Sequence, residues 1–232
     1  MKIVEQLIKD SLQELQNIAC ENESASASGK QQSKLIFPMY GKHTKNSESK
    51  RISEQESRFL FVRELEKSKN ADYYYSVETP TELSYKFSDK KIKNYEPQII
   101  SVKDGGQSAS VDVTLYKKGV NKFDREHLIE FKQGNVNTCK KDFLKLLYDM
   151  DGLYNYYVNI VDRVDLSKKN TFDSITEKYQ KAINELKEKN KGLRNSNSIL
   201  KIILFNINDG DMRVFKDINI KTDNTKVEEE KG

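Results

Sequence analysis

The chain has 232 residues, which is enough for a single domain with a sizeable core. Charged residues make up 33% of it and the net charge is +4, so the distribution of lysines says more about nucleic-acid binding than the total does. The sequence contains no signal peptide, no membrane-spanning apolar run, no CxxC motif and no GxxxxGK(S/T) phosphate loop. These absences predict a reduced, cytoplasmic setting with no membrane partner, and they argue against a nucleotide-driven motor.

The first twenty residues place apolar side chains three or four positions apart, as an amphipathic helix does: Ile3, Val4, Leu7, Ile8, Leu12, Leu15 and Ile18. Two roles stay open for residues 1–20, a helix packed on its own domain and a contact helix for a dimer or a partner protein. The first is favoured because apolar stripes are usually core. Residues 21–33 are small and polar, which predicts a flexible linker before a folded domain at 34–220. Residues 221–232 predict a disordered tail.

A second helix is predicted to begin after Ser53, which forms a capping box with Glu56. In this box each side chain satisfies the free backbone N–H of the other residue. Glu56 therefore has a structural task, whereas Glu54 has none. Further along, residues 84–96 interleave lysines with aromatic rings, which fits either a nucleic-acid groove or a solvated loop whose rings pack inward.

Several strands are predicted between the second and third helices. Tyr73–Glu78 is rich in β-forming residues and is expected to end at Pro80. Residues 98–102 and 108–116 flank two glycines, and glycine accepts the positive φ of tight turns, so these two strands are expected to form a hairpin. The chain then turns again and returns as a strand over 126–132.

The strand at 126–132 alternates apolar and polar residues. Side chains two apart share a face of a strand, so Glu130 and Lys132 point the same way, roughly 6–7 Å apart, and Phe131 points the other way. An acid and a lysine this close can bind a divalent cation and a phosphate together. On the preceding strand, Asp112 stands alone among β-forming residues, where Asp is disfavoured. The register of the two strands decides whether Asp112 meets Glu130.

The second half of the chain predicts a helix with Phe143, Leu146 and Leu147 on one face, followed by a strand, a helix and a strand. The two strands, 154–161 and 199–207, are apolar and β-branched. A strand, helix, strand order predicts a parallel crossover. The whole pattern is an α/β fold with a mixed sheet flanked by helices.

Asp112 followed by Glu130-Phe131-Lys132 resembles the D…(D/E)-x-K signature of the PD-(D/E)XK nuclease superfamily. This superfamily includes many restriction enzymes, recombination exonucleases and Holliday-junction resolvases. The resemblance covers roughly residues 50–207. It implies a restriction-endonuclease-like αβββαβ core, to which the N-terminal amphipathic helix is an addition.

The resemblance also implies a magnesium site, in which Mn²⁺ is expected to substitute for Mg²⁺. Its implied ligands are oxygen donors, which a hard cation prefers: Asp112, Glu130, the backbone carbonyl of Phe131 and Glu54, with Glu56 and Glu78 as second choices. Asp112, Glu130 and Lys132 are the implied catalytic residues. Lys132 would orient the attacking water, assist its deprotonation or stabilise the phosphorane, and the sequence leaves these three roles open.

DNA is the implied partner, with RNA left open. The expected nucleic-acid contacts lie near the end of the catalytic strand and in the lysine-rich segment: Asn135, Lys140, Lys141, Lys145, Lys91 and Lys93. Restriction enzymes of this kind are usually dimers, so a homodimer is implied as well. The implied activity is that of an endonuclease in restriction, repair or antiviral defence.

Two other classes of function stay open. In the first, the fold is present but the chain is a catalytically inactive module that binds DNA or a protein. In the second, the motif is a coincidence and the chain is a scaffold that uses its N-terminal helix and its tyrosines for protein contacts. Binding of DNA without cleavage would separate the first class from the second.

Overall fold

The computed structural model describes residues 2–28, 33–37, 52–87, 99–102, 105–134, 136–149, 153–162, 164–190, 197–221 and 225–230. Its elements in chain order are α1 (Lys2–Ser28), α2 (Glu54–Lys67), β1 (Tyr74–Phe87), β2 (Ile99–Val102), β3 (Gln107–Lys118), β4 (Phe123–Gln133), a 3-10 turn (Val136–Thr138), α3 (Cys139–Tyr148), β5 (Tyr154–Val161), α4 (Lys169–Lys189), β6 (Ile199–Asn206) and β7 (Met212–Val214).

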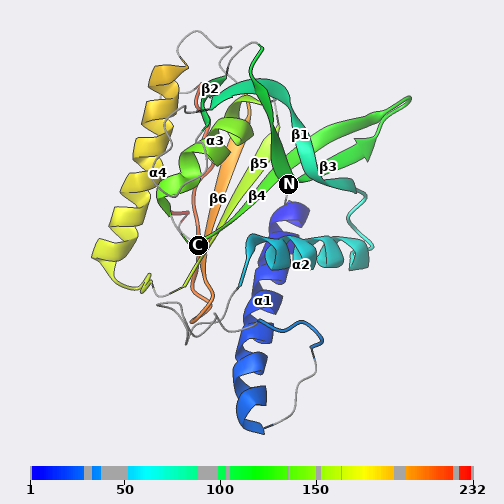
Figure 1. Ribbon diagram of the computed structural model, residues 1–232, viewed down its shortest axis with the longest axis vertical. Helices are drawn as coiled ribbons and strands as arrows, with labels where there is room; N and C mark the ends of the chain where they lie inside the picture. The colour runs from blue at the N-terminus through cyan, green and yellow to red at the C-terminus, as the bar shows by residue number, and fades with distance from the viewer. Residues whose placement is uncertain are drawn as a thin grey trace.

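The described strands form one mixed sheet in the order β2-β1-β3-β4-β5-β6-β7 (Figure 1). β1, β3 and β4 are antiparallel neighbours, whereas β4, β5 and β6 run parallel. The parallel pairs follow from α3 and α4, because each helix carries the chain back to the same end of the sheet. The predicted α/β class, the mixed sheet and the parallel crossover are confirmed.

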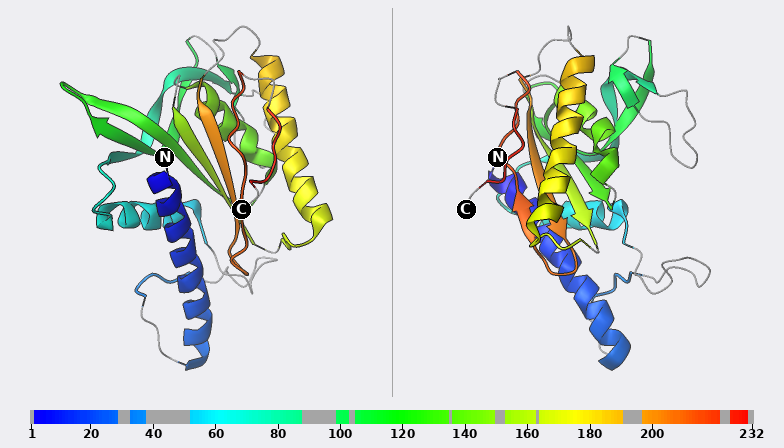
Figure 2. Two further views of the ribbon diagram at one scale, coloured as in Figure 1. Left: turned by 180° about the vertical axis from the view of Figure 1, so that it is seen from behind. Right: turned by 90° about the vertical axis from the view of Figure 1, so that its left-hand side faces the viewer.

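Helices cover both faces of the sheet (Figure 2). On one face, α1 and α2 pack against β4 through side chains such as Leu12, Phe61 and Phe131. On the other face, α3 and α4 pack against the same sheet through side chains such as Leu128 and Phe143. Alternate side chains of β4 thus pack into two different cores, because adjacent residues of a strand point to opposite faces.

The N-terminal helix packs on its own domain, as favoured from its apolar stripe. Val4, Ile8 and Leu12 are buried in the same core as α2 and the sheet. The helix continues to Ser28, so the predicted linker is wrong for residues 21–28. No proline or glycine interrupts the helix before Gly29, which explains its extra length. The rest of that linker, 29–32, lies outside the described residues.

Two strand predictions near β1 are wrong. β1 does not end at Pro80 but continues to Phe87, with Pro80 opposite Ser110 of β3. A proline is tolerated there because β1 pairs with its other neighbour only from Tyr85 onward. The missing N–H of Pro80 therefore costs no strand hydrogen bond on that side. That neighbour is β2, which was expected to form a hairpin with β3. The long β1 occupies the edge of β3 instead.

The predicted disordered tail is wrong for residues 225–230. Val227 is 4% exposed, and its N–H donates to Gln180 Oε1 on α4 at 2.8 Å. The N–H of Glu230 donates to the carbonyl of Val214 on β7 at 2.8 Å. The Glu230 carboxylate also lies 2.8 Å from Nζ of Lys201, which is nearly buried. One buried apolar side chain and a run of ion-paired glutamates therefore hold in place a segment that composition alone marks as solvated.

Substitution of Ile8 by Ala is expected to lower the free energy of unfolding by roughly 2–5 kcal/mol, because it removes a fully buried side chain and leaves a cavity. Chemical denaturation followed by circular dichroism measures this change. Ile3→Ala is the matched control on the same helix, since Ile3 is 42% exposed and should cost under about 1 kcal/mol. Equal effects of the two substitutions would show that α1 is not part of the core.

Candidate active site

The register of β3 against β4 brings Asp112 and Glu130 together. Val113 pairs with Ile129, so the next residues along, Asp112 and Glu130, face each other across the two strands. The N–H of Phe131 donates to Asp112 Oδ2 at 2.8 Å. The Asp112 carboxylate is therefore held against the backbone of the strand that carries Glu130.

Glu130 is only 5% exposed, and its nearest partner is a lysine on α3. Lys145 Nζ donates to Glu130 Oε1, lies 2.7 Å from the carbonyl of Ser110 and lies 3.4 Å from Asp142 Oδ1. Burial raises the pKa of Glu130, and the ammonium group of Lys145 opposes that rise. Lys145 itself is 5% exposed, so its predicted role as a phosphate contact is wrong. Its side chain turns inward because two buried carboxylates surround it.

Asp112 lies in a less compensated position. Its side chain is 18% exposed, and the closest cation is Arg58 on α2, with Nη1 at 3.7 Å from Oδ1. Burial raises the pKa of Asp112 to about 6, although the Phe131 N–H and the charge of Lys145 lower it. Near neutral pH the carboxylate therefore carries a charge that the surrounding protein does not fully stabilise.

Lys132 is paired with Glu54, the first-turn acid of α2 that takes no part in the capping box. Lys132 Nζ lies 2.7 Å from Glu54 Oε1, and the same oxygen accepts a hydrogen bond from the N–H of Gln133 at 3.3 Å. Burial alone would lower the pKa of Lys132, but Glu54, Asp142 and Glu130 together raise it. Lys132 is therefore an ammonium ion at neutral pH, and Glu54 lies beside it at the site.

The two second-choice acids have other partners. Glu56 accepts a hydrogen bond from the N–H of Ser53 at 2.8 Å, which confirms the capping box. Glu78 pairs with Arg58 and accepts a hydrogen bond from Ser110 Oγ at 3.1 Å. Arg58 is the main reason that the pKa of Glu78 is lowered. Through Arg58, Glu78 belongs to the surroundings of Asp112, whereas Glu56 caps a helix.

The remaining basic residues are placed only in part. Lys140 lies 2.5 Å from Glu185 of α4, and Lys141 is partly exposed on α3. The other predicted contacts, Asn135, Lys91 and Lys93, lie outside the described residues.

Asp142 was missed in the sequence, and Arg58, whose position one helical turn after Glu54 suggests an ion pair with that acid, contacts Glu78 and Asp112 instead. Arg58 follows Glu54 by one helical turn, and Asp142 precedes Lys145 by one turn, so each pair shares a helix face. Such a charged pair, on a helix next to the strands that carry the acids, is the sequence signal that could have pointed to Arg58 and Asp142 as site residues. Their inward direction depends on tertiary packing, which spacing does not reveal.

The cluster is rich in carboxylate oxygens, the donors that a hard divalent cation prefers. Asp112, Glu130 and Asp142 surround one ammonium group, that of Lys145, so carboxylates outnumber it. Asp142 is 2% exposed, and its Oδ2 has no hydrogen-bond partner among the described residues. Within those residues no three His, Cys, Asp or Glu side chains are arranged to hold a metal ion. Asp112, Glu130 and the carbonyl of Phe131 remain the oxygen donors that could hold Mg²⁺.

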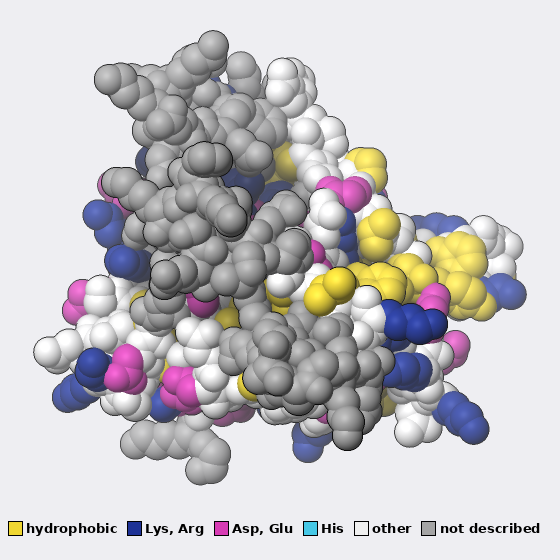
Figure 3. Space-filling view, turned by 60° about the horizontal axis from the view of Figure 1, so that its bottom comes forward, with side chains coloured by type: hydrophobic (Ala, Val, Ile, Leu, Met, Phe, Trp, Pro, Cys, Tyr) yellow, Lys and Arg dark blue, Asp and Glu magenta, His cyan; other side chains and the backbone are white. Residues whose placement is uncertain are grey.

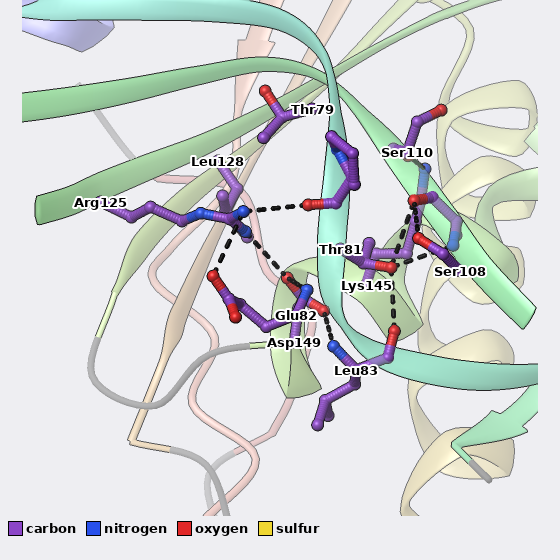
Figure 4. A network of polar contacts seen from close by, with 12 residues as sticks. Thr79, Thr81, Glu82, Leu83, Ser108, Ser110, Arg125, Leu128, Lys145 and Asp149 are labelled. Carbon is purple, nitrogen blue, oxygen red and sulfur yellow. Dashed lines mark hydrogen bonds and ion pairs between the residues drawn. The ribbon is translucent and has the colours of Figure 1, made fainter. Parts of the chain in front are cut away.

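A further buried carboxylate, Asp149, ties α3 to β1 beside this cluster (Figure 4). Asp149 is 4% exposed and accepts hydrogen bonds from the N–H groups of Glu82 and Leu83 at 3.1 and 3.0 Å, and from the hydroxyl of Tyr85 at 2.9 Å. Arg125 Nη1 lies 3.5 Å from its Oδ2. Asp149 therefore fixes the helix that supplies Lys145.

Comparison with protein-family models, with curated proteins and with solved structures finds no match to this chain. Among the described helices, none is both long enough and apolar enough to cross a membrane.

Replacement of Asp112 by Asn is expected to stabilise the protein at about pH 8 by up to about 3 kcal/mol, the equivalent of a rise in pKa from 3.8 to about 6. The folded state binds the Asp112 proton more tightly than the unfolded state does. The stability that this proton contributes to the folded state is therefore fully present below about pH 4 and is lost as the pH rises through 6. Asn keeps an oxygen for the Phe131 N–H but carries no charge. Thermal unfolding from about pH 4 to pH 8 measures the difference, with Asp124→Asn as control, because the Asp124 side chain on β4 is 47% exposed. A variant that is less stable than the wild type at every pH would contradict the prediction.

Replacement of Lys145 by Met is expected to destabilise the protein by roughly 3–5 kcal/mol, because it leaves Glu130 and Asp142 buried without their cation. The double variant Lys145→Met, Glu130→Gln should recover part of this loss. Urea denaturation of the two single variants and the double variant gives the coupling energy. Strictly additive losses would mean that the two side chains do not interact.

Proposed function

We propose that this chain is a Mg²⁺-dependent nuclease that hydrolyses DNA phosphodiester bonds, with Asp112, Glu130 and Lys132 as its catalytic residues. The observation that carries the proposal is the placement of these three groups. Asp112 faces Glu130 across β3 and β4, and Lys132 follows Glu130 on the same face of β4. An endonuclease of restriction, repair or defence is the favoured kind, and RNA is the other candidate substrate.

The order of elements supports the resemblance that first pointed to a nuclease. With β2 set aside, α2, β1, β3, β4, α3 and β5 follow one another as αβββαβ. The three β-strands form an antiparallel meander, and the fourth is parallel to the third. The acids lie where the middle and last strands of the meander pair. A fold supports many chemistries, so the site residues bear the functional weight.

Each side chain has a definable task in this proposal. A Mg²⁺ ion held by Asp112, Glu130 and the Phe131 carbonyl would offset charge that grows on the scissile phosphate. Lys132 is an ammonium ion, so it donates hydrogen bonds to the attacking water or to a phosphate oxygen and does not take up the proton of that water. Glu54 holds Lys132 in place at 2.7 Å until substrate arrives. Of the three roles left open for Lys132, proton removal is thus the least supported.

A non-cutting nucleic-acid-binding module is the second candidate, and one observation favours it. Lys145 already binds Glu130 Oε1 and so provides a counter-charge without a metal ion. In this case the acids would be a structural ion-pair network, which also perturbs pKa values.

Lys132→Met and Glu130→Gln are each expected to reduce metal-dependent cleavage at least about a hundredfold. The first removes the ammonium group that would contact the water or a phosphate oxygen, and the second removes a carboxylate that would hold Mg²⁺. Glu126→Gln on the same strand is the matched control and should cut at the wild-type rate. The assay incubates each protein with supercoiled, linear and single-stranded DNA and with RNA, in Mg²⁺, Mn²⁺ or EDTA.

Cleavage by the wild type that both site variants lose would support the nuclease, and the preferred substrate would settle DNA against RNA. Cleavage that persists in the Lys132 variant would remove that residue from the site. Binding of nucleic acid without cleavage in any metal would favour the second candidate.

A further inference from the structure

The paired ends of β3 and β4 project from the body of the molecule as a two-stranded arm (Figure 1). We define the arm as residues 117–123 together with Tyr74 of the neighbouring β1. Its tip is a tight turn, in which the N–H of Gly119 donates to the carbonyl of Lys122 at 2.8 Å. A Cβ at Gly119 would displace the Asp124 side chain and would lie 3.1 Å from the carbonyl oxygen of Lys122. The tip is therefore a defined turn and not a slack loop.

Large hydrophobic side chains on the arm face solvent (Figure 3). Val120 at the tip is 98% exposed, Phe123 is 51% exposed and Tyr74 is 48% exposed. The rings of Tyr74 and Phe123 meet edge to face with centroids 4.7 Å apart, so Phe123 is held in place while much of its ring stays open. Exposed apolar side chains gathered in this way mark an interaction surface.

The arm is also basic. Residues 117–123 contain three lysines and no acidic residue. Lys118 is exposed and makes no ion pair within the described part of the chain. Lys122 is 79% exposed and lies 3.1 Å from Asp124, an exposed pairing that contributes little and can be exchanged for a phosphate. Lys118 lies opposite Phe123 in the strand register, so a cation and an open ring stand side by side.

The arm continues the strand that carries Asp112. Asp112 and Lys118 are six residues apart on β3, about 20 Å at roughly 3.3 Å per residue, and the register of β3 against β4 shifts between them, at Leu115 and Tyr116. We propose that the arm binds a single-stranded segment of the nucleic-acid substrate, with Lys118 and Lys122 on phosphates and the Phe123 ring against a base. This proposal rests on the nuclease function proposed above.

Charge and ring exposure favour a single strand over a second copy of the chain. A symmetric dimer through the arm would bring two basic arms together, with only Asp124 beside each of them to offset the repulsion. A polyanion is attracted by the same lysines. Aromatic rings interleaved with lysines suit unpaired bases, whose flat faces are free to stack, whereas bases inside a duplex are already stacked.

Binding of a labelled single strand of about 20 nucleotides in EDTA tests the proposal without cleavage. Phe123→Leu keeps an apolar side chain but removes the ring, and affinity should fall about tenfold. Lys118→Gln with Lys122→Gln should reduce the slope of log affinity against log salt by roughly 1.4, or 0.7 per phosphate contact. Lys178→Gln with Lys181→Gln, exposed on α4, removes the same charge and should change neither quantity.

Wild-type affinity in both arm variants would overturn the proposal, as would a Phe123→Leu loss that is equal on blunt duplex and on single strand. Dimerisation of the wild type that Phe123→Leu abolishes, measured by light scattering, would assign the arm to a second copy instead. The two proposals fail separately. Arm variants that bind and cut like the wild type would end this inference alone, whereas a wild type that binds strands through the arm but never cuts would end the nuclease proposal alone.

Discussion

The register between β3 and β4 is the constraint on which the candidate site depends. Val113 and Ile129 face the core beneath α1 and α2, and Leu128 faces the core beneath α3. A slip of one residue would turn these side chains to the wrong faces and would drive Glu130 into an apolar core, at a cost that folding could not recover. The same hydrophobic contacts that stabilise the sheet therefore set the facing of Asp112 and Glu130.

This placement leaves a charge imbalance that a purely structural ion-pair network would be expected to avoid. Lys145 pairs directly with Glu130 and Asp142 in the core. It acts on Asp112 only through its charge, and the Asp112 carboxylate, with Arg58 at 3.7 Å, keeps a pKa of about 6. Buried carboxylates in excess of their cations destabilise the folded state until a further cation arrives. Such a cost is common at functional sites, where local rules are broken for the sake of chemistry.

The sequence predicted those features that depend on neighbouring residues. Period-two alternation gave the facing of Glu130 and Lys132, the Ser53 box gave the start of α2, and apolar strands gave the parallel crossover. Features that depend on distant residues escaped it. The inward turn of Lys145 depends on Glu130 and Asp142, which come from two elements. The pairing of β2 with β1 depends on which strand edge is open. The order of residues 225–230 depends on partners on α4 and β7. Composition alone predicts that lysine and glutamate side chains are exposed, because it does not reveal their tertiary partners.

Asp149 has a consequence for how the molecule opens. It ends the helix that carries Lys145, and it holds two amide groups of β1, those of Glu82 and Leu83, in the stretch where the pairing of β1 with β3 breaks register. Amides outside the strand pairing ordinarily exchange their hydrogens with water readily, but these two are protected as long as Asp149 accepts their hydrogen bonds. Hydrogen exchange at these two amides of β1 would thus report the detachment of α3, and with it the exposure of the Glu130 carboxylate.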